Sequence, residues 1–156
     1  MRITDALREE HKVFCVRFDE LDQLVSLSRD VVLLRPKASL LANGLLSHTR
    51  IENDILFPLL ERFLGRTGPL ATMKAQHEEI EGGLLEILVW RVNEAEVHDP
   101  EHARAAVKGI LQIARQHLAM EDRMFWMAEK ILGEDQLNEL GQQFAERRRA
   151  EPLACS

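Results

Sequence analysis

Apolar residues recur with a helical period along almost the whole chain, and strand signals are nearly missing. The pattern predicts a first helix that is capped by Thr4 or Asp5 and runs to about Arg29. Its apolar stripe reads Leu7, Phe14, Phe18, Leu21 and Val25. A one-sided stripe of this kind is typical of a helix that packs against a core.

A second helix is predicted from Pro36, a residue suited to a first helical turn, to near Gly65. Pro58 lies inside this segment, where we expect a kink rather than a break. Residues 65–69 form a turn, and a third helix follows to about Glu96.

Asp99 and Pro100 are a cap and first-turn pair that begins a fourth helix, which Gly133 ends. A weaker fifth helix covers roughly 135–149. Because the connections between long helices are short, the predicted fold is all-α, an up-down-up-down four-helix bundle with a short C-terminal fifth helix. Residues 1–133 would form the bundle, and residues 134–156 the additional helix and a tail.

Polar residues interrupt the apolar stripes near the middle of each bundle helix. On the first helix His11 falls between Leu7 and Phe14. On the next three helices a histidine is followed four residues later by a glutamate on the same face: His48 and Glu52, His77 and Glu81, His117 and Glu121. The two halves of the chain therefore repeat loosely, which would place two equivalent half-sites face to face.

Taken singly, these features have ordinary explanations. An inward histidine is more often a hydrogen-bonded core residue than a metal ligand, and one histidine–glutamate pair is usually a surface pair. Interruptions on four helices are harder to explain, because three buried carboxylates without compensation would cost several kcal/mol each. A metal cluster removes this cost by balancing their charge. The pattern therefore predicts a metal site.

The mixture of imidazole and carboxylate without thiolate suits iron, manganese or zinc. Seven ligands are too many for one tetrahedral zinc ion and are the right number for two metals that share bridging carboxylates. Ferritin-like di-iron bundles instead carry Glu-x-x-His on two helices and single glutamates on the others.

Composition narrows the class of protein. The 156 residues suit one domain, and the formal net charge of −6 argues against non-specific binding of nucleic acid. The N-terminus lacks the apolar run of a signal peptide, and no stretch approaches the roughly 18 apolar residues of a membrane span.

Cys15 and Cys155 form no disulfide or zinc pattern, so we expect a reducing, cytoplasmic setting. Cys15 is predicted to be a small buried core residue rather than a redox group.

On these residues the chain resembles the haemerythrin, or HHE cation-binding, family from about Ile3 to Leu132. The resemblance rests on Leu7-Arg-Glu-Glu-His11, the three His-x-x-x-Glu pairs, and Leu56-Phe57-Pro58. It implies two iron ions with a bridging oxo or hydroxo group, for which manganese or zinc could substitute. One iron would be bound by His11 and His48, the other by His77, Glu81 and His117, with Glu52 and Glu121 as bridges.

Two positions bear on this implied assignment. Oxygen-carrying haemerythrins bridge with an aspartate five residues after the last histidine, here Asp122, so Asp122 is the alternative to Glu121. The same carriers have a histidine where this chain has Glu81. A carboxylate is a harder donor than imidazole and favours ferric iron, which argues against reversible oxygen carriage.

Three functional hypotheses follow. The first is a non-haem di-iron protein that reacts with dioxygen or peroxide, as an oxidase- or peroxidase-like or redox-responsive protein. The alternative is a protein that binds or senses dioxygen, nitric oxide or iron without turnover. The third, a helical interaction module without metal, would leave three buried carboxylates to be satisfied in another way. The additional helix is a candidate surface for a homodimer, and Arg147–Arg149 is interpreted as a charged helix end.

Overall fold

The computed structural model describes residues 1–27, 33–89 and 100–153, and these residues are helical almost throughout. The helices in chain order are α1 (Ile3–Leu27), α2 (Leu34–Ile51), the π-helical segment η2 (Glu52–Leu56), α3 (Phe57–Leu64), α4 (Pro69–Val89), α5 (Pro100–Ile131) and α6 (Glu134–Ala150). No strand occurs among the described residues, which confirms the all-α prediction. Among them, no helix combines the length and the apolar character needed to cross a bilayer.

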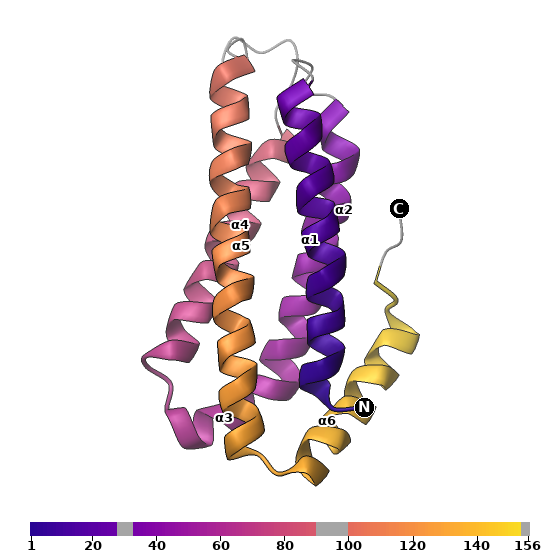
Figure 1. Ribbon diagram of the computed structural model, residues 1–156, viewed down its shortest axis with the longest axis vertical. Coiled ribbons are helices and arrows are strands. Elements are labelled where there is room, and N and C mark those ends of the chain that lie inside the picture. Colours follow the sequence, from indigo (N-terminus) through magenta and orange to yellow (C-terminus); the bar gives the residue numbers. More distant parts are fainter. Residues whose placement is uncertain (28–32, 90–99, 154–156) are drawn as a thin grey trace.

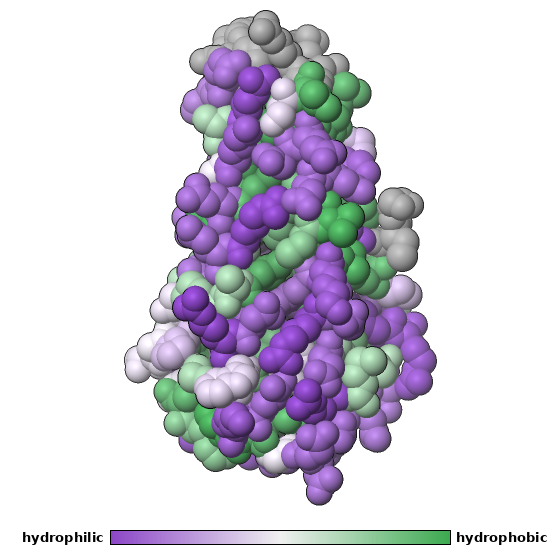
Figure 2. All heavy atoms as spheres, viewed as in Figure 1, coloured by the Kyte–Doolittle hydropathy of each residue, from purple (hydrophilic) through white to green (hydrophobic). Residues whose placement is uncertain are grey.

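The long helices form the predicted four-helix bundle, with its axis vertical in Figure 1. Helix α1 packs against α2 and α5, and α4 packs against the same two helices from the other side. The predicted stripe of α1 is buried, from Leu7 at 0% exposure to Val25 at 2%. Polar residues cover most of the face shown in Figure 2, with apolar patches between them.

Two separate apolar clusters make up the core. One includes Phe57, Phe125 and side chains of α6, and the other includes Phe14, Phe18 and Leu111. The interrupting histidines and glutamates occur at the level where one cluster gives way to the other along the helices. The bundle therefore holds a buried polar layer between two apolar regions.

The second bundle helix is continuous past Pro58, as predicted, but its irregularity begins before the proline. The backbone widens into the π-helical turn η2, in which the N–H of Phe57 donates to the carbonyl of Glu52, five residues back. Pro58 then occupies the first turn of α3, where a missing N–H costs little. Insertions of this kind are frequent at functional sites, and here the π turn begins at one of the buried glutamates.

Helix α6 starts at the lower end of the bundle in Figure 1 and lies beside the N-terminal end of α1. Leu137, Leu140 and Phe144 belong to the same apolar cluster as the bundle residues. Gly141 faces the start of the chain so closely that an added Cβ would lie 1.9 Å from the carbonyl oxygen of Met1. The C-terminal helix is thus a packed part of the molecule.

One local prediction is wrong: Cys15 is exposed, because it follows Phe14 by one position and so points about 100° away from the buried stripe of α1. Helix α5 ends at Ile131, close to the predicted end at Gly133, and Gly133 is the N-cap of α6 in extended conformation, with φ −70° and ψ 162°. The predicted end of the third helix and the cap at Asp99 lie outside the described residues, as does Cys155.

Candidate metal centre

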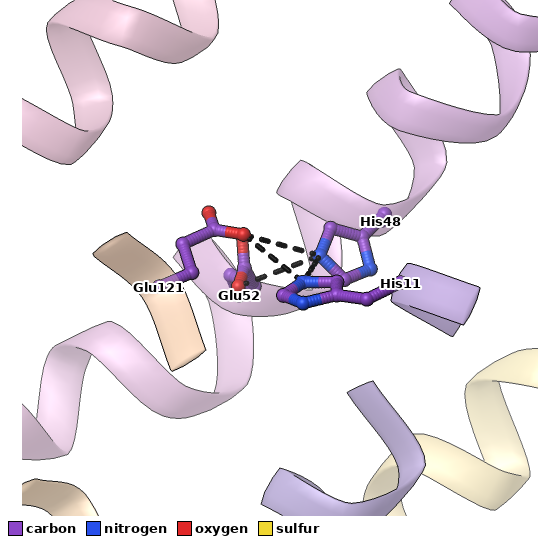
Figure 3. A group of neighbouring side chains, drawn as sticks. All are labelled: His11, His48, Glu52 and Glu121. Atoms are coloured by element: carbon purple, nitrogen blue, oxygen red, sulfur yellow. Dashed lines mark hydrogen bonds and ion pairs between the residues drawn. The ribbon is translucent and has the colours of Figure 1, made fainter. Parts of the chain in front are cut away.

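The interrupting side chains of the four bundle helices converge in the buried layer. Figure 3 shows two imidazoles and two carboxylates of this group pointing toward one another. The converging residues are His11 from α1, His48 from α2, Glu52 from η2, His77 from α4, and His117 and Glu121 from α5. Each is at most 8% exposed, and both glutamates are fully buried.

Glu121 lies at the centre of the group. Its Oε1 is 2.7 Å from Nε2 of His77 and 2.6 Å from Nε2 of His117. Its Oε2 is 3.1 Å from Nε2 of His11 and 3.8 Å from Nε2 of His48. The carboxylate therefore contacts both histidine pairs, one pair with each oxygen.

Glu52 also lies between the two halves. Its carboxylate oxygens are 3.5 Å from Nε2 of His48 and 3.4 Å from Nε2 of His77. Two groups of mutually close ligand atoms result, one with His11, His48, Glu52 and Glu121, and one with His77, His117 and Glu121. The geometry thus has the two-centred form expected from the internal repeat.

The charges in this layer are strongly coupled. Burial and the neighbouring Glu121 raise the pKa of Glu52. Burial alone would also raise the pKa of Glu121, but the contacts with four imidazoles outweigh it and hold that pKa well below its usual value. Burial opposes protonation of His48, yet Glu52 and the other nearby carboxylates raise its pKa well above normal. Without a metal ion, the raised pKa values of His11 and His48 favour protonated rings, whose charge offsets part of that of the carboxylates.

The outward nitrogens of three histidines have partners. Nδ1 of His48 donates to Glu10 at 2.8 Å, and Nδ1 of His117 contacts the amide oxygen of Gln76 at 2.7 Å. Nδ1 of His11 donates to Asp122 at 3.1 Å. A partner on Nδ1 fixes the tautomer in which Nε2 carries a lone pair, and metal-binding histidines are oriented in this way.

Several buried atoms in the layer lack the hydrogen bonds that a closed polar network would provide. Both carboxylate oxygens of Glu52, Oε2 of Glu121 and Nε2 of His117 are buried, and their close contacts do not have the geometry of hydrogen bonds. Buried polar atoms in this state are rare and call for an explanation. Divalent metal ions would coordinate these atoms and balance the two carboxylates, so the donor set fits a metal centre.

Glu81 differs from the other predicted ligands. It is only partly buried and does not belong to either close group of ligand atoms. It lines a cavity that also borders His77, His117 and Glu121. The structure therefore places Glu81 beside the second half of the site, without direct contact to the carboxylates.

Asp122, the alternative bridge, lies on the outer side of His11. Its side chain is 51% exposed and contacts Nδ1, whereas Nε2 of the same ring faces Glu121. The two carboxylates are thus on opposite sides of one imidazole, and it is Glu121 that faces the interior.

Sequence reasoning missed the residues behind the histidines. Glu10 is 7% exposed, and Arg148 of α6 donates to both of its carboxylate oxygens. Glu10 immediately precedes His11 in the chain, which was the available signal, but its partners His48 and Arg148 are joined to it only by the fold. Phe125 is fully buried, and its ring centre is 5.3 Å from that of His11.

The family model of the hemerythrin HHE cation binding domain matches residues 2–128, well over half of the 156 residues. The chain therefore belongs to the hemerythrin HHE cation-binding family, which confirms the resemblance inferred from its motifs. No curated protein and no solved structure matches the chain. Family membership and the buried histidine–glutamate group together indicate a metal-binding helical bundle.

Proposed function

We propose that this protein is a non-haem di-iron protein that reacts with dioxygen or peroxide. The observation that carries the proposal is the convergence of four Nε2 atoms on two buried carboxylates, with three of the rings held from behind through Nδ1. A bound di-iron centre would supply redox-active metal able to react with small oxygen species. The oxo or hydroxo bridge and the choice of iron over manganese or zinc are part of this proposal.

The close approach of the ligand atoms supports the proposed role of each predicted ligand except Glu81. We assign His11 and His48 to one ion, and His77, Glu81 and His117 to the other. Glu52 and Glu121 would bridge, since each lies between histidines of both halves. For Glu81 the support is its position in the cavity wall next to His77, from which a side-chain rotation could complete the second half-site.

A small cavity borders His48 of the first half-site and His77 and His117 of the second, and it suits a diatomic or similarly small ligand. The cavity has a volume of about 20 Å³, enough for roughly one small molecule. Its wall is mostly apolar: Ala42, Leu45, Leu46, Ile80, Leu84 and Leu118. An apolar wall admits dioxygen or nitric oxide readily and limits the entry of bulk water.

A surface groove gives this cavity an access route. The groove between α2 and α4 is lined by Arg50, Asn53 and Lys74 among others, and it shares Leu46, Thr49, His77 and Glu81 with the cavity. Glu81 therefore borders both spaces, so a ligand entering from the groove would pass it.

Binding or sensing of dioxygen, nitric oxide or iron without turnover is the alternative function. The observation that favours it is the link from α6 through Arg148 and Glu10 to His48, since a change at the centre could reach a terminal helix. A cytoplasmic location and a homodimer remain predictions; the apolar side chains of α6 are packed against the bundle of its own chain.

The test is the visible absorption spectrum of iron-loaded, anaerobically reduced protein, recorded while dioxygen is added and then removed. We expect about two iron ions per chain, a one-way spectral change, and steady consumption of added peroxide. His11→Ala should lose these properties, and His102→Ala, which alters an exposed histidine of α5, should keep them.

Three results would count against the proposal. An oxygen-dependent band that disappears on removal of dioxygen would indicate reversible binding and overturn the argument from Glu81. A spectral change without peroxide turnover would favour the sensing alternative. Protein that retains no metal would exclude both functions.

A further inference from the structure

A charged chain of contacts connects the C-terminal helix to one of the candidate ligands. The guanidinium of Arg148 donates to Glu10 Oε1 through Nε and to Oε2 through Nη2, at 2.5 and 2.9 Å. Glu10 Oε2 in turn accepts from Nδ1 of His48 at 2.8 Å. Arg148 also donates to the hydroxyl of Ser47 at 2.6 Å, so it contacts the residue next to His48 as well.

The arginine is held in place before any metal binds. Its side chain is 12% exposed, and its guanidinium lies 5.5 Å from the ring centre of Phe144, one turn earlier on α6. Phe144 belongs to the apolar cluster of the bundle, and Gly141 fits α6 closely against the start of α1. Because the helix is fixed, the Arg148 side chain loses little conformational freedom when it makes its bidentate contact with Glu10.

Arg148 makes a buried carboxylate tolerable at this position. The Glu10 side chain is buried, and its two oxygens accept bonds from the positively charged guanidinium of Arg148. One of these oxygens also accepts from Nδ1 of His48. This bond fixes the ring so that Nε2 points at Glu52 and Glu121.

The other three histidines are supported less strongly. Asp122 behind His11 is half exposed, and the partner of His117 is the neutral amide of Gln76. Nδ1 of His77 is buried without a hydrogen-bond partner. Among the described residues, His48 is thus the one candidate ligand backed by a buried carboxylate that an arginine anchors.

We propose that Glu10 and Arg148 are positioning residues that set the metal affinity of the half-site containing His11 and His48. The inference rests on the proposed metal-binding function and adds to it. Arg148 lies on α6, beyond the residues 2–128 that match the family model, so a helix outside the matched domain would control one half of the centre.

The experiment is an anaerobic titration of metal-free full-length protein with Co²⁺, followed by the visible bands of the bound ion. The variants are Arg148→Met and Glu10→Gln, which keep much of the side-chain volume. Each has a matched neighbour as control: Arg147→Met, an arginine paired with Asp54, and Glu9→Gln, an exposed glutamate paired with Lys12.

We expect both variants to weaken one of two Co²⁺ binding steps by roughly 10- to 100-fold, the range typical for loss of a partner behind a ligand. The other step and both controls should match the wild type. Arg148→Lys should recover part of the affinity, because it restores the charge but not the paired contact. In zinc-loaded protein, the Nδ1 proton resonance of His48 should shift in both variants and stay unchanged in the controls.

The outcomes separate this inference from the proposed function. If Arg148→Met and Glu10→Gln bind both ions as tightly as their controls, the positioning role is overturned while metal binding stands. If the wild type binds no Co²⁺, the proposed function itself fails. Should Arg148→Met not fold, Glu10→Gln decides, since it leaves α6 unaltered.

Discussion

At the scale of single residues, Glu121 is the group on which both halves of the site depend. It is fully buried, and its two oxygens contact different histidine pairs. Glu121→Gln keeps the shape but removes the charge and one of the two oxygen donors. Loss of a residue that only hydrogen-bonds a ligand typically weakens metal binding by about 10- to 100-fold. Because Glu121 is itself a proposed ligand, we predict a loss of roughly 100-fold or more. Metal content after dialysis measures it.

The neighbouring Asp122→Asn is the matched control. Because Asp122 contacts the outer nitrogen of His11 and an amide oxygen can accept the same bond, its metal content should stay near that of the wild type. The reverse result, loss of metal in Asp122→Asn and retention in Glu121→Gln, would make Asp122 the bridge.

Glu81 yields a second prediction. If it completes the half-site of His77 and His117, Glu81→Ala should weaken one of the two metal-binding steps by about tenfold or more. Glu78→Ala, an exposed glutamate that lines the same groove, should have no such effect. Isothermal titration with Zn²⁺ distinguishes the two steps. Equal affinities in both variants would remove Glu81 from the ligand set.

The sequence predicted the residues of the polar layer because their spacing is local. A histidine and a glutamate four residues apart share a helix face, and a face that is otherwise apolar must be buried. The partners behind the histidines could not be found in this way. Glu10 and Arg148 are 138 positions apart, and only the docking of α6 brings them together. Nothing in the sequence separates the neighbouring arginines Arg147 and Arg148. Arg147 nevertheless lies near the surface, paired with Asp54, whereas Arg148 lies next to the site, paired with Glu10.

At the scale of helices, the existence and order of the elements followed from periodicity, whereas their irregular details did not. Pro58 signalled a disturbance, but whether a helix kinks or inserts a π turn depends on packing around Glu52. Helix α6 was predicted as weak, and it spans Glu134–Ala150 because its apolar side chains reach the bundle core. Tertiary contacts thus stabilised what local propensity left uncertain.

Docking of α6 can be tested at Gly141. A side chain there would collide with the backbone of Met1, so Gly141→Ala should lower the free energy of unfolding by about 1–3 kcal/mol. Gly109→Ala is the control, since nothing lies within 4 Å of an added Cβ in the middle of α5. That change should stabilise the protein by about 0.5–1 kcal/mol. Urea unfolding measures both free energies. If Gly141→Ala stabilised the protein as Gly109→Ala is expected to, the close fit of α6 would be contradicted.

At the scale of the whole molecule, a polar layer divides the core into two apolar clusters. The bundle therefore carries two buried carboxylates in a place where apolar packing would otherwise be continuous. The raised pKa of His48 favours a protonated ring that offsets part of this charge, but several atoms stay without hydrogen bonds. Metal ions that bind the folded layer and not the unfolded chain must then stabilise the entire bundle.

This coupling predicts a large thermal shift. At a free Zn²⁺ concentration 100 times the dissociation constant, one site adds about 2.7 kcal/mol. For a chain of this size that raises Tm by roughly 5–10 °C, and two sites should double the shift. Scanning calorimetry with and without Zn²⁺ measures it, and a chelator should reverse it. Glu121→Gln should lose most of the shift, because its remaining oxygen cannot serve both ions. An equal shift in that variant would mean that zinc binds elsewhere, and no shift in the wild type would mean that the layer is satisfied without metal.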